Sequence, residues 1–256
     1  MLTDYKGPCT ITVANTVIDA KRILCDSLDI EATGVVISRS LVVSGIVSSP
    51  ENAVFRWTMV DSEVNAPINL GTSFPALGWS GFTLLRDNIH GSFLNVYCHS
   101  DCTITDSWLH GADVPRTADW HLAALRFDDH AMNGGPTNAL ASHNTLSCSA
   151  VPTANDTGGC TADLGMLADF GGIVGVTIAR NLFVAAPTSV AYCGYFGTTN
   201  AHGAETRQIV VRENVFQRGA NAQCGAYGPA TAFSTTAPGN VWSGNVWDDG
   251  TAVSPD

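Results

Sequence analysis

The chain has 256 residues, a formal net charge of −11 at pH 7 and a sequence pI near 4.8, with only 14% charged residues. This length suffices for one large domain or two small ones with a substantial core. An acidic surface repels phosphate backbones, which argues against nucleic-acid binding, and the sequence has no apolar run of about 18 residues that could span a membrane.

The composition predicts an all-β fold. Gly, Thr, Ser, Asn and Val recur throughout the chain; β-branched residues suit strands, whereas Gly and Asn suit turns. Long apolar stripes of helical period are missing, so we expect few and short helices. The opening MLTDYKGPC lacks the charged and apolar regions of a signal peptide, so the sequence predicts none at this end.

A short phrase recurs along the chain, most plainly at 175–185, 208–219 and 240–250. It reads apolar-x-apolar-x-x-polar-x-apolar, and the polar member is Ser40, Ser62, Asp87, Ser107, Asn144, Asn181, Asn214 or Asn245. Two residues after each of them an apolar residue follows, namely Val42, Val64, Ile89, Leu109, Leu146, Phe183, Phe216 and Trp247. Successive polar members are 20 to 37 residues apart. A fixed phrase with elastic spacing indicates a coil whose corners accept insertions.

The repeat has a direct physical interpretation. Each phrase is a strand whose alternate residues point inward, followed by a bend at the polar residue. Stacked coils would place like residues about 4.8 Å apart, so that apolar columns fill a core and stacked Asn or Ser side chains hydrogen-bond along their column. We therefore predict one all-β domain over 1–256, a parallel β-helix with an N-terminal cap at about 1–30 and about eight coils at about 31–250. The alternative is a β-sandwich, whose hairpin signals are missing here before Asp249-Gly250.

The rungs HNTLSC, ARNLFVA and RENVFQRG resemble the pectate-lyase-like superfamily of single-stranded right-handed parallel β-helices. The segments GGCTADLGMLADFGG, VFQRGANAQCGAYGP and APGNVWSGNVWDDGTAV are further similar to a group of secreted bacterial β-helix proteins without an assigned activity. The likeness covers about residues 30 to 250 and implies the fold. It implies little about chemistry, because the superfamily holds polysaccharide lyases, glycoside hydrolases, esterases, epimerases and phage tailspikes. The calcium-binding acids and arginine base of its pectate lyases have no convincing match here, and the polygalacturonase motifs are incomplete.

Eight cysteines stand at positions 9, 25, 98, 102, 148, 160, 193 and 224. The sequence has no tight C-x2-C pair for zinc. Spacings of 16, 4, 12 and 31 residues between successive members favour four local disulfides. The pairing Cys9–Cys25, Cys98–Cys102, Cys148–Cys160 and Cys193–Cys224 is therefore our hypothesis, and it predicts an oxidising, extracellular setting.

Two histidines, His90 and His110, each stand three residues after the polar residue of their phrase. Their side chains should point outward and lie next to each other on adjacent coils. Two imidazoles at that separation oppose each other's protonation, which favours a neutral form able to act as a base or metal ligand. The alternative is a solvated surface pair.

The insertions at 111–138 and 148–175 hold the densest set of titratable residues and mark the expected functional face. From the first insertion we select Arg116, Trp120, His121, Arg126, Asp128 and Asp129. His121 would join the two histidines as a third base or as a third nitrogen of a metal site, or would cap its loop. Asp163 and Asp169 in the second insertion are either neighbours of this region or ordinary turn acids.

Four aromatic residues are candidates for stacking on sugar rings, because aromatic faces suit the apolar faces of sugars. They are Trp108, Trp120, Tyr195 and Tyr227. The phenol of Tyr195 can also supply a proton. The alternative for the two tyrosines, which follow cysteines on adjacent coils, is burial against a disulfide.

These features lead to the hypothesis of a secreted polysaccharide lyase that acts by β-elimination on a uronic-acid-containing polymer. Elimination needs neutralisation of the carboxylate, a base for the C5 proton and an acid for the leaving oxygen. We assign the first role to Arg126 or to Ca²⁺ held by Asp128 and Asp129, the second to His110 or His121, and the third to Tyr195 or to a second histidine such as His90.

Two other functions stay open. One is a non-catalytic glycan-binding or structural β-helix, such as a tail or cell-surface adhesion module, and the other is a glycoside hydrolase. In each case we expect a polysaccharide or glycan partner, no nucleic acid, no membrane span, a monomer, and no required cofactor other than the calcium considered above.

Overall fold

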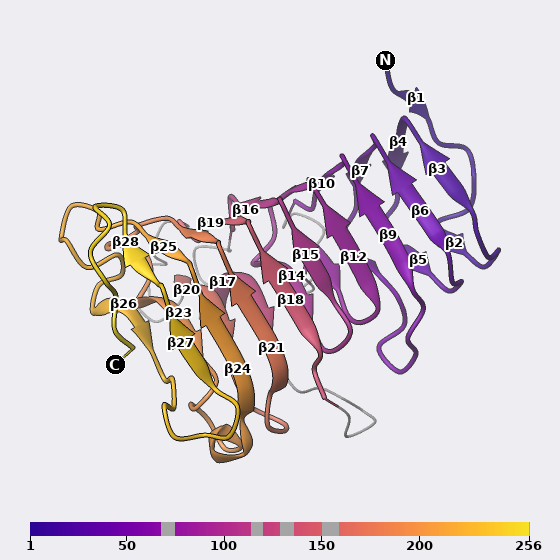
Figure 1. Ribbon diagram of the computed structural model, residues 1–256. Helices are drawn as coiled ribbons and strands as arrows, with labels where there is room; N and C mark the ends of the chain where they lie inside the picture. The colour runs from indigo at the N-terminus through magenta and orange to yellow at the C-terminus, as the bar shows by residue number, and fades with distance from the viewer. Residues whose placement is uncertain (68–74, 114–119, 129–135, 150–158, 256) are drawn as a thin grey trace.

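The computed structural model describes residues 1–67, 75–113, 120–128, 136–149 and 159–255. In this part the chain winds repeatedly through three sheets whose strands pair in parallel, and the coils stack along one axis from the N-terminus to the C-terminus (Figure 1). The fold is the expected all-β, single-stranded, right-handed parallel β-helix.

We name the three sheets A, B and C. The described strands of sheet A, in order, are β1 (Thr3–Asp4), β4 (Lys21–Leu24), β7 (Leu41–Val43), β10 (Glu63–Asn65), β13 (Asn88–His90), β16 (Trp108–His110), β19 (Thr145–Leu146), β22 (Leu182–Phe183), β25 (Val215–Phe216) and β28 (Val246–Trp247). Those of sheet B are β2 (Thr10–Ile11), β5 (Leu28–Ile30), β8 (Val47–Ser48), β11 (Leu77–Gly78), β14 (Leu94–Cys98), β17 (His121–Phe127), β20 (Gly159–Met166), β23 (Tyr192–Phe196) and β26 (Gly228–Thr231). Those of sheet C are β3 (Val17–Asp19), β6 (Val35–Ser38), β9 (Trp57–Val60), β12 (Phe82–Leu85), β15 (Thr103–Thr105), β18 (Ala139–Ser142), β21 (Val174–Ala179), β24 (Arg207–Arg212) and β27 (Val241–Ser243).

The repeated phrase covers a strand of sheet C, the bend after it and the next strand of sheet A. Its apolar members form the predicted inward columns. In sheet A, for example, Val64, Ile89 and Leu109 are neighbours in register, and all three are fully buried. Since each coil places the same column one strand spacing further along the axis, the core is continuous through the stack.

The polar members form the expected hydrogen-bonded column. Each side-chain oxygen accepts the backbone N–H of the polar residue one coil earlier: Asn181 Oδ1 accepts from Asn144 N at 2.9 Å, and Asn214 Oδ1 accepts from Asn181 N at 2.9 Å. The Asn amides also donate to backbone carbonyls, as Asn181 Nδ2 does to Ala141 O at 3.0 Å. These buried polar groups are therefore satisfied at each bend.

The parallel strands begin before residue 31. The strands β1 to β5 all lie within the first 30 residues, where the sequence predicts a cap, and they already pair into the three sheets. Lys21 pairs with Thr3 and occupies the polar column, where its N–H donates to Ser40 Oγ at 3.0 Å. The stack therefore starts about one coil earlier than the phrase indicated.

The four predicted disulfides are present: Cys9–Cys25, Cys98–Cys102, Cys148–Cys160 and Cys193–Cys224. Proteins of oxidising compartments are the usual place for such a set. In the described segments the helical structure consists of the 3₁₀ turn Gly203–Glu205, and no helix there is long and apolar enough to cross a membrane.

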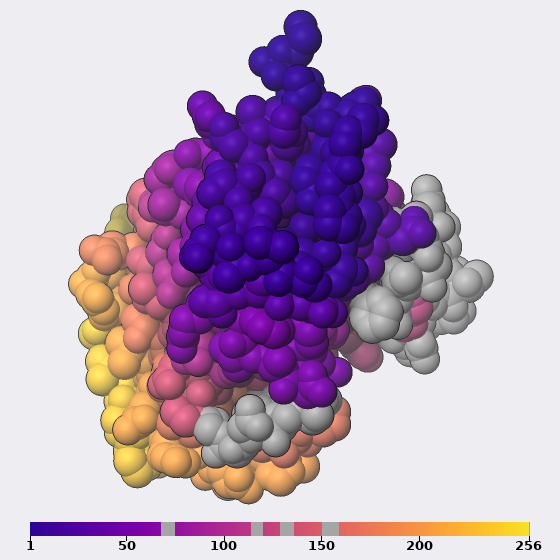
Figure 2. Space-filling model, turned by 90° about the vertical axis from the view of Figure 1, so that its right-hand side faces the viewer, coloured from indigo at the N-terminus to yellow at the C-terminus, as the bar shows by residue number. Residues whose placement is uncertain are grey.

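Figure 2 looks along the stack from the side of the N-terminal coils, with the first residues projecting beyond them. Several apolar side chains at this end are exposed, among them Val13, Val17 and Leu24. No further strand covers the outer edges of β1, β2 and β3 in the described structure, because each is the end strand of its sheet.

Candidate functional site

The two histidines lie together on the outer face of sheet A, as predicted. His90 in β13 and His110 in β16 are partners in register, and their ring centroids are 5.2 Å apart with an interplanar angle of 27°. Both side chains are half-buried. The fully buried residues directly before them, Ile89 and Leu109, hold each strand in the core, so the rigid scaffold fixes the spacing of the two imidazoles.

Each imidazole is oriented by an acceptor from the preceding coil. His90 Nε2 lies 3.0 Å from Glu63 Oε1, and His110 Nε2 lies 2.7 Å from Asn88 Oδ1. A carboxylate or amide oxygen only accepts, so Nε2 carries the hydrogen in both rings. The Nδ1 atom of each neutral ring is then the acceptor, and within the described chain neither Nδ1 has a hydrogen-bond partner.

The surroundings of His110 favour its neutral form. Burial lowers the pKa of His110 below its usual value, and the neighbouring His90 lowers it further, while Glu63 acts in the opposite direction. Trp108, two residues earlier on the same strand, stacks on the His110 ring with centroids 3.5 Å apart and 17° between the planes. Because Trp108 is 49% exposed, it offers an aromatic surface beside a neutral imidazole.

The predicted third histidine does not join this pair. His121 begins β17 in sheet B, and its Nδ1 lies 3.2 Å from Thr161 Oγ1. Among the described residues no ring contact or hydrogen bond connects it to His90 or His110. β16 in sheet A ends at His110, whereas His121 begins β17 in sheet B, so the predicted three-histidine cluster has no direct contact among the described residues.

Arg126 lies on the outer face of sheet B in a network of its own. Its guanidinium donates to Asp128 Oδ2 at 2.9 Å and to Asp169 Oδ2 at 2.6 Å, and it sits 5.1 Å from the centre of the Tyr97 ring. Tyr97 also donates its hydroxyl to Asp128 Oδ2 at 3.0 Å. Two carboxylates share this one cation, so Arg126 is already neutralised within the protein.

The Asp128 carboxylate does not fit the predicted calcium site. One of its oxygens accepts from Tyr97 and Arg126, and the other accepts the Asp169 N–H at 3.3 Å. Burial raises the pKa of Asp128 although Arg126 is adjacent. Calcium requires six to eight oxygen ligands, whereas here a guanidinium occupies the position of the cation. Asp129 and Arg116 lie outside the described residues.

The predicted tyrosines continue the outer face of sheet B. Tyr195 is in register with Gly165 and, one coil further back, with Arg126. Tyr192 contacts Tyr195 with ring centroids 5.5 Å apart and Tyr227 with centroids 5.9 Å apart. Burial and its tyrosine neighbours raise the pKa of Tyr195. Tyr227 is 71% exposed, so burial against a disulfide is excluded for it.

The remaining selected residues are structural or separate. Trp120 packs against Phe93, with ring centroids 5.5 Å apart, at the edge of the core. Asp163 is fully buried, where its Oδ1 accepts the Cys148 N–H at 2.7 Å, and burial raises its pKa well above the usual value. Asp169, in contrast, is the predicted neighbour of Arg126.

Sequence reasoning missed the residues that orient the two histidines. Glu63 and Asn88 each follow directly after the polar residue of a phrase. The register puts Glu63, Asn88 and Trp108 in one outward column, two residues before the histidine column. This position was available from the repeat, but side chains there vary freely because none enters the core.

No protein-family model matches the chain, and no curated protein or solved structure is significantly similar to it.

Proposed function

We propose that this protein is a secreted carbohydrate-active β-helix that acts by proton transfer at the His90–His110 pair, with β-elimination from a uronic-acid-containing polymer as its reaction. Membership of the pectate-lyase-like superfamily is part of the proposal. The observation that carries it is the arrangement on sheet A, where an exposed Trp108 stacks on a neutral His110 beside His90, which is oriented by Glu63.

The roles follow from the hydrogen bonds. His110, whose Nε2–H is bound to Asn88, would use its Nδ1 lone pair to remove the C5 proton. Protonated His90, with Glu63 as counter-ion at 3.0 Å, would give a proton to the leaving oxygen as the C4–O bond breaks. The apolar face of the sugar would lie on Trp108. Proton exchange with solvent would then restore both rings.

A second function, glycan binding without catalysis, is favoured by the position of Arg126. The network of Asp128 and Asp169 holds this residue on sheet B, whereas the histidine pair is on sheet A. Among the described residues, the charged groups that shift the pKa of His110 are His90 and Glu63. No arginine or lysine is among them. No described residue beside the histidine pair is therefore assigned to neutralise the carboxylate of a substrate.

We expect the substitution His110→Ala to leave the fold intact, because the side chain lies outside the core. It should reduce turnover by about 10²-fold or more, as for the loss of a general base. The assay is the ultraviolet absorbance of unsaturated uronates released from a panel of uronate polymers. Since the pKa of His110 is lowered, wild-type activity should persist at neutral pH and fall on acidification.

The matched control is His143→Ala, because His143 is an exposed histidine at a bend of another coil. It should retain wild-type turnover. Full activity in His110→Ala would exclude the base. Binding of a glycan by wild-type protein without turnover on any polymer would support the second function instead.

A further inference from the structure

A cavity of about 380 Å³ lies on the outer face of the N-terminal coils, where sheet A turns into sheet B. Its volume falls within the range of small-molecule sites. The described residues that line it are Asp26, Ser27, Asp29, Gly45, Ile46, Ser48 and Trp79.

The charged residues that line this cavity in the described structure, Asp26 and Asp29, are both acidic. Asp26 is exposed and Asp29 half-buried, and neither forms an ion pair within the described chain. Asp29 accepts a hydrogen bond from the Ser27 hydroxyl, which leaves its negative charge in place. The described lining residues include no lysine, arginine or histidine. Two carboxylates without a counter-ion at one cavity attract a cation.

The side chain of Ser48, a largely buried residue, also lines the cavity. Ser48 is only 6% exposed and stands next to Asp29 in register on the outward side of sheet B. In the described part of the chain its side chain has no hydrogen bond, although it lines the cavity. The Ser48 hydroxyl is therefore free to donate to or accept from a polar group of a ligand in the cavity.

Trp79 supplies an aromatic wall. The indole is half-buried and is held by Tyr97 and His99, whose ring centroids lie 5.4 Å and 4.9 Å from its own. An indole attracts cations over its face and also packs against the C–H face of a sugar ring. The wall therefore suits a ligand that carries both a positive charge and a ring.

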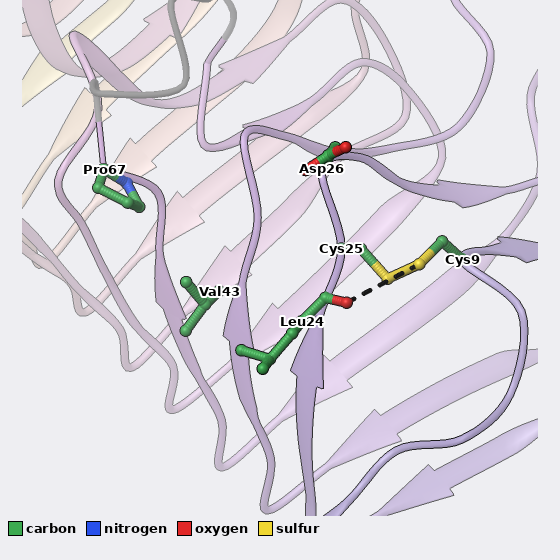
Figure 3. Close-up of a pocket in the computed structure, with 6 residues that line it drawn as sticks. All are labelled: Cys9, Leu24, Cys25, Asp26, Val43 and Pro67. Atoms are coloured by element: carbon green, nitrogen blue, oxygen red, sulfur yellow. Dashed lines mark hydrogen bonds between the residues drawn. A yellow bond between two sulfur atoms is a disulfide. The ribbon is translucent and has the colours of Figure 1, made fainter.

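A second cavity, of about 430 Å³, also has Asp26 in its lining. It is lined by Asp26 and otherwise by Leu24, Val43, Pro67 and the disulfide Cys9–Cys25 (Figure 3). The disulfide directly precedes Asp26 and fixes this corner. Asp26 thus lines both a polar, aromatic cavity and an apolar one, so a ligand longer than one ring has a surface for its next unit.

Metal ions and anionic sugars fit this site poorly. Among the described residues the one group that brings three His, Cys, Asp or Glu ligand atoms together is Asp163 with Cys193 and Cys224, and both cysteines are disulfide-bonded. Asp26 and Asp29 alone provide too few oxygens for calcium. A uronate would bring its carboxylate against two others.

From these observations we infer that the cavity beside Trp79 binds a protonated amino sugar, a residue of a glycan with free amino groups. The ammonium would lie between the carboxylates of Asp26 and Asp29, the ring on Trp79, and a sugar hydroxyl on Ser48. The glycan part of this inference rests on the proposed function, but the site is separate from the histidine pair. A glycan with free amines would also be attracted by the net charge of −11.

The test is isothermal titration at pH 6 with a glucosamine tetramer, its fully N-acetylated counterpart, and spermidine as an amine without a sugar. We expect the glucosamine tetramer to bind about tenfold or more tightly than either of the others. The double variant Asp26→Asn, Asp29→Asn and the variant Trp79→Ala should each weaken its binding about tenfold or more. A control, Asp4→Asn with Asp19→Asn, removes the same charge from neighbouring coils and should bind like wild type.

Equal binding of the N-acetylated tetramer would overturn the amine, equal binding of spermidine would overturn the sugar, and unchanged binding by the Asp26, Asp29 double variant would overturn the site. His110→Ala should still bind the glucosamine tetramer. Lost turnover with retained binding in that variant therefore supports both proposals. Turnover by wild-type protein without any binding of the tetramer overturns this inference alone.

Discussion

Replacing Phe216 by Ala should lower the free energy of unfolding by about 3–5 kcal/mol, which is the range for a buried aromatic residue truncated to Ala. Phe216 is fully buried in sheet A, and its ring stacks on Phe183 with centroids 4.4 Å apart and 9° between the planes. Trp242 of the adjacent sheet C is a second ring neighbour at 6.4 Å. The truncation would leave a cavity in the middle of the C-terminal coils. Denaturant unfolding with the disulfides intact measures the resulting loss of unfolding free energy.

Trp247→Ala is the matched control for this prediction. Trp247 follows Phe216 in the same column, as predicted, but it is half-buried, and its ring packs against the Arg218 guanidinium at 4.5 Å. It lies at the end of the stack, so its truncation opens no closed cavity and should cost clearly less. A loss below about 1 kcal/mol in Phe216→Ala would contradict the continuous aromatic core.

The sequence predicts the fold well because one phrase carries both the core and the bend. Apolar columns, the polar column and the outward position of His90 and His110 all follow from that phrase, and the structure confirms each. The disulfides also follow, since each joins two successive cysteines of the chain. The first coil was missed because Lys21 takes the polar position with its backbone N–H, so its side chain is not constrained to Asn, Ser or Asp.

The candidate site was harder to predict, because the phrase contains no strand of sheet B. Strands such as β17 and β20 lie within the insertions, so their position around the coil cannot be counted from the polar residue. His110 and Arg126 are only 16 residues apart, yet they lie on different sheets. Trp79, Asp26 and Asp29 were missed for the same reason, since register brings them together across coils.

Asp87 is the acid in the polar column of Ser and Asn residues, and burial raises its pKa to about 7. Its side chain is 2% exposed, and it accepts the N–H groups of Ser62 at 2.8 Å and Leu85 at 3.0 Å. The unfolded carboxyl ionises near pH 3.8, whereas the folded one retains its proton up to about pH 7. Its contribution to stability is therefore full below pH 3.8 and is lost as the pH rises to about 7.

We expect the difference in unfolding free energy between Asp87→Asn and wild type to shift in favour of the variant by about 4 kcal/mol between pH 4 and pH 8. This magnitude corresponds to about three pKa units at roughly 1.4 kcal/mol each. Asn does not titrate, and every other group titrates in both proteins, so the difference isolates Asp87. The control is Asp249→Asn, because hydrogen bonds from Thr251 and Arg218 lower the pKa of the exposed Asp249 to about 2 and its difference from wild type should stay nearly constant over this range. Denaturant unfolding at a series of pH values measures both, and parallel curves for wild type and Asp87→Asn would show that the carboxyl is ionised inside the column at all of them.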